Sequence, residues 1–226
     1  MSAWPSTAEE LIQVQDELAC ADARPWSPSS GDLSVGGVFV CFQRGPSGPG
    51  RSGEPAWAAA AVLRSGRVTA SAAVAGRAGA AYEAGLLALR EGAVLEAAVR
   101  VLTELPDVLL VDATGRDHPR RAGLALHLGA VLDLPTVGVT HRPLLAKGEW
   151  PADERGAQSP LHLDGELVGY WLRTRRGTRP LAVHAAWRTG PEAALAVVRA
   201  SLGRTRAPEP LREARRLART DRARCS

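Results

Sequence analysis

One carboxylate and one basic loop of this sequence stand where they could do chemistry together. The run 108–111 is wholly apolar and is followed by Asp112, which predicts a buried central strand with a carboxylate at its carboxyl end. A metal ion or a substrate could reach a carboxylate placed there. The loop that follows contains His118, Arg120 and Arg121, and its basic side chains suit contact with phosphate groups.

The surrounding segments predict the elements that would hold this carboxylate. We expect strands at 35–42, 56–64, 67–75, 108–112, 136–140, 160–163, 167–173 and 181–187, and helices starting after Thr7 and over 82–105, 121–132 and 191–202. Tight turns are expected at 65–66 and 164–165. Three antiparallel strands, a helix and then strand–helix–strand is the order of a ribonuclease H-like sheet. We therefore predict an α/β fold with a mixed sheet flanked by helices in a single domain.

Composition and charge narrow the class of protein. A chain of 226 residues that is 45% hydrophobic fits one large domain. Along it we distinguish an N-terminal helix and loop (1–34), a central domain (35–203) and a basic C-terminal tail (204–226) that forms a helix or stays mobile. The net charge of +4 permits nucleic-acid binding without requiring it. Widely spaced cysteines, no signal peptide and no membrane-spanning run indicate a cytoplasmic protein without a membrane partner; we expect a monomer.

Five parts of the chain carry a resemblance to a known family. They are VGGVFVCF from Val35, YEAGLLALRE from Tyr82, the long segment LLVDATGRDHPRRAGLALHLGAVLDLPTVGVTHRPL from Leu109, the later segments ERGAQSPL and GYWLRTRRGTRPL, and RAPEPLREA from Arg206. In order and spacing these segments resemble endonuclease V, a metal-dependent nuclease that cuts near deaminated purines. The resemblance covers nearly the whole chain.

The resemblance implies a cleavage centre in which carboxylates gather Mg²⁺, and this chain keeps only part of it. Glu91 and Asp112 match two of the family's catalytic and metal-binding carboxylates. The first-strand Asp falls on Phe39, the Lys after the second buried strand on His141, and the His after the last strand on Trp187. A phenyl ring cannot bind Mg²⁺. We therefore expect cleavage to be reduced or lost, and we expect Phe39 and Trp187 to pack together over the place of the metal.

The binding features implied by the resemblance are better preserved. Tyr82 matches the strand-separating wedge, whereas Ala113 narrows the base pocket by a methyl group. The residues that match the pocket for a flipped deaminated base are Gly85, Leu87, Gly115, Gly123 and Leu144. His118, Arg120 and Arg121 would contact the nucleic-acid backbone of DNA or RNA that contains deoxyinosine or inosine.

Three hypotheses follow for the function. The first is a nucleic-acid-binding homologue with weak or no cleavage. The second is a working nuclease that uses a reduced site of Glu91 and Asp112. The third is a non-enzymatic interaction protein that no longer binds nucleic acid. The matched pocket glycines favour the first two hypotheses, and the missing carboxylate at Phe39 favours the first and the third.

Overall fold

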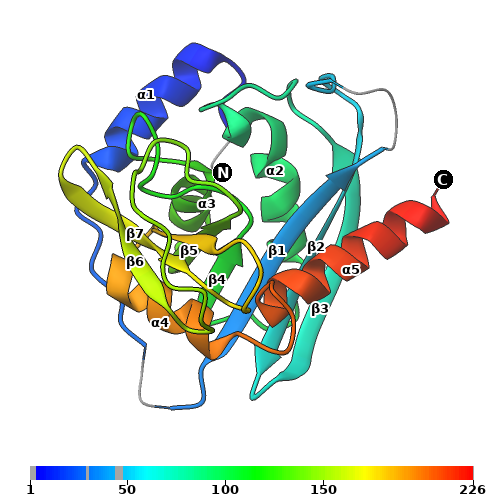
Figure 1. Cartoon of the computed structure of the whole chain (residues 1–226). Helices are drawn as coiled ribbons and strands as arrows, with labels where there is room; N and C mark the ends of the chain where they lie inside the picture. The colour runs from blue at the N-terminus through cyan, green and yellow to red at the C-terminus, as the bar shows by residue number, and fades with distance from the viewer. Residues whose placement is uncertain (1–3, 29–30, 44–47, 226) are drawn as a thin grey trace.

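The fold is built on one mixed sheet of eight strands in the order β3-β2-β1-β4-β5-β8-β7-β6 (Figure 1). The computed structural model describes residues 4–28, 31–43 and 48–225. The strands are β1 (Ser34–Phe42), β2 (Pro55–Arg64), β3 (Arg67–Arg77), β4 (Val108–Val111), β5 (Thr136–Thr140), β6 (Gln158–Leu163), β7 (Glu166–Leu172) and β8 (Leu181–Ala185). The helices are α1 (Ala8–Ala19), α2 (Leu87–Arg100), α3 (Leu124–Leu132), α4 (Pro191–Ala200) and α5 (Glu209–Arg224). The predicted α/β class is confirmed.

The three central strands run parallel, and this sets the edge at which their loops meet. β1 pairs with β4, and β4 with β5, in parallel, whereas the outer strand pairs are antiparallel. The loops after β1, β4 and β5 therefore leave the same edge of the sheet, which is the edge where open α/β sheets bind ligands. Asp112 lies at this edge, directly after β4.

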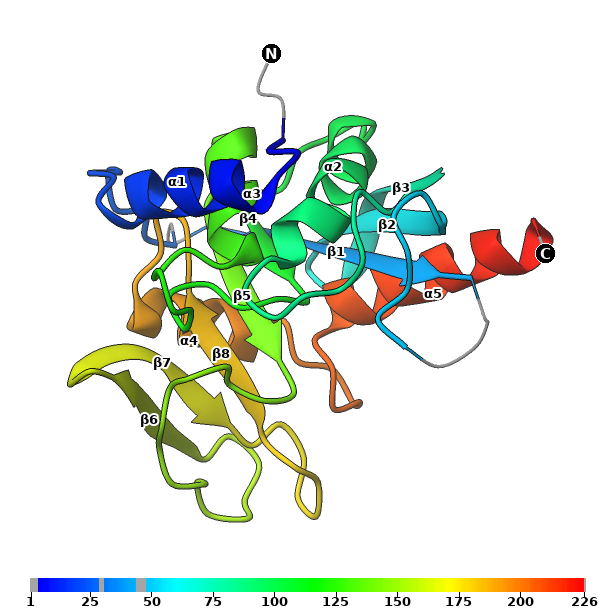
Figure 2. The same cartoon turned by 90° about the horizontal axis from the view of Figure 1, so that it is seen from above.

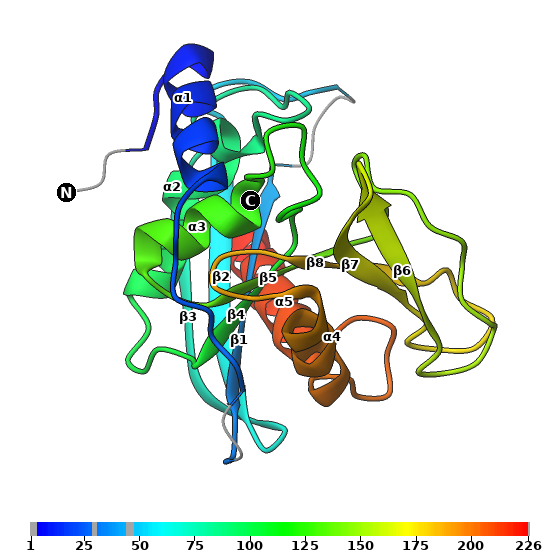
Figure 3. The ribbon, with the colours of Figure 1, turned by 90° about the vertical axis from the view of Figure 1, so that its left-hand side faces the viewer.

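Helices cover both faces of the sheet (Figures 2 and 3). α1, α2 and α3 lie on one face, over a core that includes Leu11, Val38 and Leu109. α4 and α5 lie on the other face, over a second core that includes Val35, Leu110 and Leu211. The alternation of Val38 and Val35 between these cores follows from the two-residue period of a strand.

The C-terminal segment forms a packed helix, which decides between the two alternatives for the tail. α5 crosses β1 and β2, and its Ala218 shares a small core with Trp57 and Ala59 of β2. The helix approaches so closely that a side chain at Gly37 would lie 2.3 Å from the backbone of Pro210. The segments 1–34 and 204–226 therefore supply α1 and α5 to the same three-layered domain as the central part.

The turns and the first helix form where local chemistry favours them. Thr7 and Glu10 complete a reciprocal capping box at the start of α1. Ser65-Gly66 and Asp164-Gly165 all have positive φ, as a two-residue hairpin turn of this type requires. Both hairpins are thus confirmed. No helix among the described residues is long and apolar enough to cross a membrane.

Two helices near the site begin later than the sequence predicts. The helix expected from Tyr82 begins at Leu87, because Gly85 has a φ of +83° and turns the chain just before it. The helix expected from Arg121 begins at Leu124, because Arg121 has a φ of +54° and Gly123 is the N-cap. In both cases a loop replaces the first turn of the expected helix, and that loop carries candidate site residues.

Candidate nucleic-acid site

A pocket lies at the carboxyl edge of β1 and β4. The pairing of Val38 with Val111 sets Phe39 level with Asp112 on the neighbouring strand. The pocket has a volume of about 260 Å³ and is lined by Val38, Phe39, Val40, Tyr82, Leu87, Glu91, Leu95 and Asp112. The structure thus brings both candidate carboxylates, the candidate wedge and one candidate base-pocket residue together in one place.

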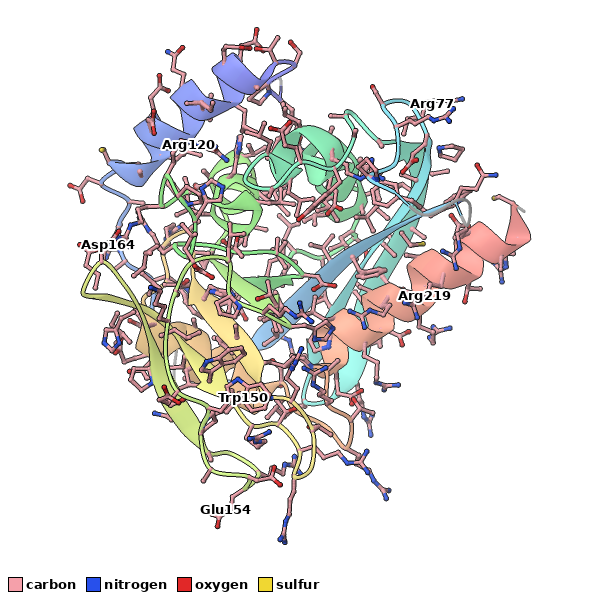
Figure 4. The ribbon with its side chains drawn as sticks, turned by 45° about the horizontal axis from the view of Figure 1, so that its top comes forward. Arg77, Arg120, Trp150, Glu154, Asp164 and Arg219 are labelled. Atoms are coloured by element: carbon pink, nitrogen blue, oxygen red, sulfur yellow. The ribbon has the colours of Figure 1, made fainter. Side chains whose placement is uncertain are left out.

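The charge of Asp112 is matched by an arginine that the sequence analysis did not single out. Arg215 of α5 donates to a carboxylate oxygen of Asp112 over 3.0 Å. Its guanidinium carbon lies 4.8 Å from the centre of the Phe39 ring, within the range of a cation–π contact. Arg219, one turn further along α5 (Figure 4), lies 5.9 Å from the same ring. Phe39 and Arg215 therefore form one unit beside Asp112.

The surroundings of Glu91 favour the neutral form of its carboxyl group. Burial and the negative charge of Asp112 raise its pKa to about 8, and the neighbouring Arg90 opposes this rise. The first cause is loss of water around the charged carboxylate, and the second is repulsion between two like charges. Of the two carboxyl groups in the pocket, Asp112 is the one that Arg215 contacts.

The side chains in this pocket do not fit a bound Mg²⁺ ion. Mg²⁺ prefers a near-octahedral set of oxygen ligands, but Phe39 offers none, and Asp112 is paired with Arg215. Across residues 4–28, 31–43 and 48–225, no group of three or more His, Cys, Asp or Glu side chains could hold a metal ion. In this pocket the guanidinium of Arg215 is the cation beside the Asp112 carboxylate.

The expected contact between Phe39 and Trp187 is wrong. Phe39 packs beside Cys41 and Trp57 on the α5 face of the sheet, whereas Trp187 packs against the core under α2 and α3. The backbone of Trp187 is bonded to Thr136, at the amino end of β5, whereas Asp112 follows the carboxyl end of β4. The antiparallel course of β8 carries Trp187 away from the pocket.

His141 lies near the pocket and within a group of positive charges. Burial and the positive charge of Arg206 lower its pKa, with further contributions from Arg215 and Arg179, whereas Asp112 raises it. Arg206, whose Nε donates to the Arg179 carbonyl over 2.8 Å, lies just before α5, the helix that carries Arg215. The burial of His141 is only partial, because its side chain remains accessible to solvent.

The loop after β5 is fixed by a buried carboxylate. Asp117 accepts hydrogen bonds from the backbone N–H groups of Leu144, Leu145 and Ala146 over 2.5–2.8 Å. Its other side faces His184, whose Nδ1 lies 3.7 Å away, and burial lowers the pKa of that imidazole. The side chain of Leu144 is left 38% exposed. Asp117 thus fixes the backbone of Leu144, a candidate pocket residue. The sequence analysis did not identify Asp117.

Hydrogen bonds at the Gly85 carbonyl join the loop before α2 to the loop after β4. The carbonyl of Gly85 accepts from Gln15 of α1 and from Arg120, and it lies 3.0 Å from Nε2 of His118. The Nδ1 atom of His118 accepts from the backbone N–H of Arg120. Since both ring nitrogens of His118 are engaged and the residue is buried, its observed contacts stabilise the loop. Arg120, labelled in Figure 4, also donates to Gln15.

The remaining candidate residues are also bonded or packed within the protein. Arg121 donates to the carbonyl of Leu163 and to the carboxylate of Asp164, at the turn between β6 and β7. An added side chain would lie 2.1 Å from the Ala185 carbonyl at Gly115, and 2.4 Å from the Thr114 carbonyl at Gly123. Glycine is therefore needed at both positions because any larger residue would clash with backbone carbonyl groups of the protein itself. The base-binding and phosphate-binding roles of this set stay predictions.

Tyr82 stands apart from the core. It is 53% exposed, and its backbone N–H donates to the carbonyl of Pro49 over 2.7 Å. The backbone is thus anchored while the ring lies at the rim of the pocket that contains Asp112. An exposed ring on an anchored loop is compatible with the predicted wedge.

Comparisons with known proteins agree over nearly the whole chain. A model of the endonuclease V family matches residues 32–216. Endonuclease V of Nostoc punctiforme is 34% identical over 217 residues, which cover 95% of each protein. The match to endonuclease V of Roseiflexus sp. (strain RS-1) is 47% identical over 113 residues, and this chain spans about half (51%) of that relative.

Solved structures give the same result for the fold. The crystal structure of endonuclease V from Streptomyces avermitilis aligns with a TM-score of 0.84 and 36% identity, covering 99% of this chain and 96% of that one. Endonuclease V of Ciona intestinalis, in complex with a 24mer DNA containing an inosine followed by a ribo-adenosine, has a TM-score of 0.77 at 22% identity, with 96% and 98% covered. The ribonuclease H-like class predicted from the order of the elements is confirmed.

Proposed function

This chain belongs to the endonuclease V family, and we propose that it binds DNA or RNA containing deoxyinosine or inosine while its capacity to cleave the strand is reduced or lost. The binding part of the proposal extends to this chain what a family member of the same fold is seen to bind. The cleavage part rests on the side chains around Asp112. We also propose that the protein acts as a monomer in the cytoplasm.

The ion pair between Arg215 and Asp112 is the observation that carries the proposal. A carboxylate at the carboxyl edge of β4 would repel the phosphates of an approaching strand unless a cation neutralised it. Arg215 supplies that cation at 3.0 Å, and the Phe39 ring supports its guanidinium. The pocket can therefore accept a polyanion without Mg²⁺. It has Phe39 at the place of the third carboxylate that the family resemblance implies for holding Mg²⁺ and activating a water molecule.

The loops support the binding half of the proposal. Asp117 holds the backbone of 144–146 through three hydrogen bonds, and Gly85 is joined to the 118–120 loop. Loops held in this way lose little conformational entropy when a ligand binds between them. A flipped base, which must be recognised by atoms at fixed positions, needs loops of this kind.

The test measures binding and incision on the same strands. Affinity for an inosine strand and a matched adenosine strand is determined in EDTA, and incision of the inosine strand is followed with Mg²⁺ or Mn²⁺. We expect tighter binding to the inosine strand in EDTA and no incision at rates typical of enzymes. Equal affinity for both strands at physiological salt would contradict the binding proposal.

A second candidate function is a nuclease with a reduced metal site. It is favoured by one observation: Glu91 and Asp112 still line the same pocket, and the charge of Asp112 acts on Glu91. Under this alternative, Mg²⁺ or Mn²⁺ would compete with Arg215 for Asp112. Metal-dependent incision of the inosine strand that Asp112→Ala abolishes would establish it and overturn the loss of cleavage.

A further inference from the structure

Trp150, outside the pocket, has a half-exposed ring that packs against a buried neighbour. Trp150 is 52% exposed, and Figure 4 shows it on the side of the molecule where β7 and β8 approach the start of α5. Its ring meets that of Trp171 edge-on, with centroids 6.3 Å apart and an interplanar angle of 74°. Trp171 is buried, and its indole N–H donates to the Gly148 carbonyl over 3.1 Å. Trp150 is thus held against a fixed neighbour.

Buried Arg173 fixes the loop that carries Trp150. Its guanidinium donates to the carbonyls of Pro151 and Ala152, over 3.2 and 3.3 Å, and also to that of Thr178. It lies 3.4 Å from the carboxylate of Asp153, and its central carbon is 5.8 Å from the centre of the Trp150 ring. The loops 150–153 and 173–178 therefore move as one piece with the ring.

A second arginine connects Trp150 to the pocket. The guanidinium carbon of Arg179 lies 5.5 Å from the centre of the Trp150 ring, and the Arg179 carbonyl accepts from Arg206 over 2.8 Å. Arg206 also donates to the Pro180 carbonyl over 3.2 Å, and it lies just before α5, the helix whose Arg215 pairs with Asp112. A row of guanidinium groups, Arg215, Arg206 and Arg179, thus leads from Asp112 to Trp150. We call this row and Trp150 the basic strip.

The basic strip lacks internal negative charge beyond Asp112. Burial and the positive charges of Arg179 and Arg215 lower the pKa of Arg206, and no carboxylate raises it. Among the described residues, the ion pairs contain neither Arg179 nor Arg206. Neighbouring cations that repel one another bind a polyanion favourably, because its phosphates remove the repulsion.

We propose that the basic strip binds the single-stranded continuation of the nucleic acid, with an unpaired base stacked on Trp150. The proposal rests on the proposed function, since it extends the strand held at the Asp112 pocket. Phosphates lie along Arg206 and Arg179. Only an unpaired base can lay its face on the indole, so the strand at this point is single. Stacking of this kind is tolerant of base identity, so Trp150 adds affinity, and inosine selectivity belongs to the pocket.

The experiment compares two inosine strands. One carries only a single nucleotide on each side of the inosine, and the other is extended on either side by about 8 nucleotides, a length within the range of single-strand sites. We expect Trp150→Ala to weaken binding of the extended strand by about 5- to 100-fold, the range given by loss of one base–aromatic stack. Binding of the short strand should stay unchanged. Trp150→Phe should retain most of the affinity, and Leu105→Ala, another exposed apolar residue, serves as the control.

A change in the ligand tests the stack without altering the protein. An extended strand whose added nucleotides lack bases should bind wild type as weakly as the base-bearing strand binds Trp150→Ala, and the variant should not distinguish the two strands. Arg179→Ala should lower the salt dependence of binding, whereas Trp150→Ala should not. Equal binding of the base-bearing and abasic strands by wild type would overturn the proposal.

The two proposals fail in different ways. Loss of preference for inosine over adenosine on the short strand would overturn the proposed function and leave the effect of Trp150→Ala on extended strands measurable. An inosine preference on the short strand together with wild-type affinity of Trp150→Ala for the extended strand would overturn only the stacking surface. Failure of the wild-type protein to bind any strand would overturn both.

Discussion

The Asp112 pocket and the loops after β4 and β5 are neighbours at one edge of the sheet, but they differ in what holds them. In the pocket, the charge depends on one contact between Asp112 and Arg215. In the loops, Asp117 alone accepts three backbone hydrogen bonds, and the Gly85 carbonyl is approached by three side chains. Few side chains set the chemistry of the pocket, whereas many bonds set the shape of the loops.

Under the proposed function, this difference would let cleavage and binding separate within one fold. A phenyl ring at position 39 and a guanidinium beside Asp112 would alter the pocket without disturbing the backbone of β1 or β4, which pair in regular register. A change in the loops would instead break several buried hydrogen bonds and cost stability. Four predictions test whether the two regions differ in this way.

The largest effect is expected from removal of the Asp117 carboxylate. Asp117→Ala leaves three backbone N–H donors of 144–146 without their acceptor. We expect a loss of about 3–5 kcal/mol in the free energy of unfolding, the range for breaking a buried charged network, measured by denaturant titration. Asp16→Ala is the control, because this carboxylate is exposed within α1 and its removal should cost less than about 0.5 kcal/mol. If the two variants were equally stable, the loops would not depend on Asp117.

Acid should lower the stability of the protein through His127 in α3. His127 of α3 is buried, and burial lowers its pKa to about 4 from 6.5. The unfolded chain therefore binds the proton more readily between these values, so stability present above pH 6.5 is lost as the pH falls toward 4. The shift corresponds to roughly 3 kcal/mol. Unfolding free energies measured across this window should fall for wild type, and the slope should lessen in His127→Leu. If His127→Leu left the pH dependence of the unfolding free energy unchanged, His127 would not be the group responsible for the acid sensitivity.

A substitution at Gly123 should affect folding before it affects base selectivity. An added side chain would lie 2.4 Å from the carbonyl oxygen of Thr114, so we expect Gly123→Ala to cost about 1–3 kcal/mol of stability through overpacking. Gly190→Ala is a matched control at another helix N-cap, where a Glu192 oxygen, 3.9 Å away, would be the nearest atom to the added side chain outside the adjoining residues. Thermal unfolding would measure both. A stable Gly123→Ala protein that bound inosine and adenosine strands equally would instead support a direct role in the base pocket.

The smallest effect is expected in the pocket. Arg215→Ala leaves the charge of Asp112 unbalanced, so affinity for an inosine strand in EDTA should fall by about 10-fold, or about 1.4 kcal/mol. Mg²⁺ should restore part of this loss by neutralising Asp112. Arg216→Ala removes an equal charge from the next position of α5, where the arginine pairs with Glu213. Equal effects of the two substitutions, with no response to Mg²⁺, would show that Arg215 acts only as general positive charge.

The sequence predicted those features that depend on short stretches of chain. The Ser65-Gly66 and Asp164-Gly165 turns follow from residues that accept positive φ, and the capping box follows from Thr7 and Glu10. The neighbourhood of Phe39 and Asp112 was also predictable, because both lie near the carboxyl ends of strands expected in one sheet. Local patterns fix these features before tertiary packing is known.

The errors concern features set by contacts between distant segments. The position of Trp187 depends on the antiparallel pairing of β8 with β5, which the sequence pattern of β8 alone does not specify. The start of α2 depends on the Gly85 carbonyl, which bonds with side chains from α1 and the 118–120 loop. Neither the strand pairing nor the hydrogen bonds to Gly85 can be predicted from the neighbouring residues in the sequence.

Arg215 was missed for a similar reason, although a signal for it exists. Leu211, Ala214 and Ala218 recur at helical spacing, and all three are buried. This stripe predicts an amphipathic helix that packs on the domain, and Arg215 follows directly after one of its members. What the stripe does not specify is which part of the sheet the helix covers, and so which carboxylate the arginine meets.

The docking of α5 on β1 and β2 also has a consequence for synthesis of the protein. Residues 209–224 follow every strand of the sheet in the chain, so they leave the ribosome after all eight strands have been made. Until then the face of β2 that carries Trp57 and Ala59 has no cover, and exposed apolar sheet surface of this kind is prone to aggregation. The newly made chain therefore passes through a stage in which this apolar face of the sheet has not yet received its covering helix.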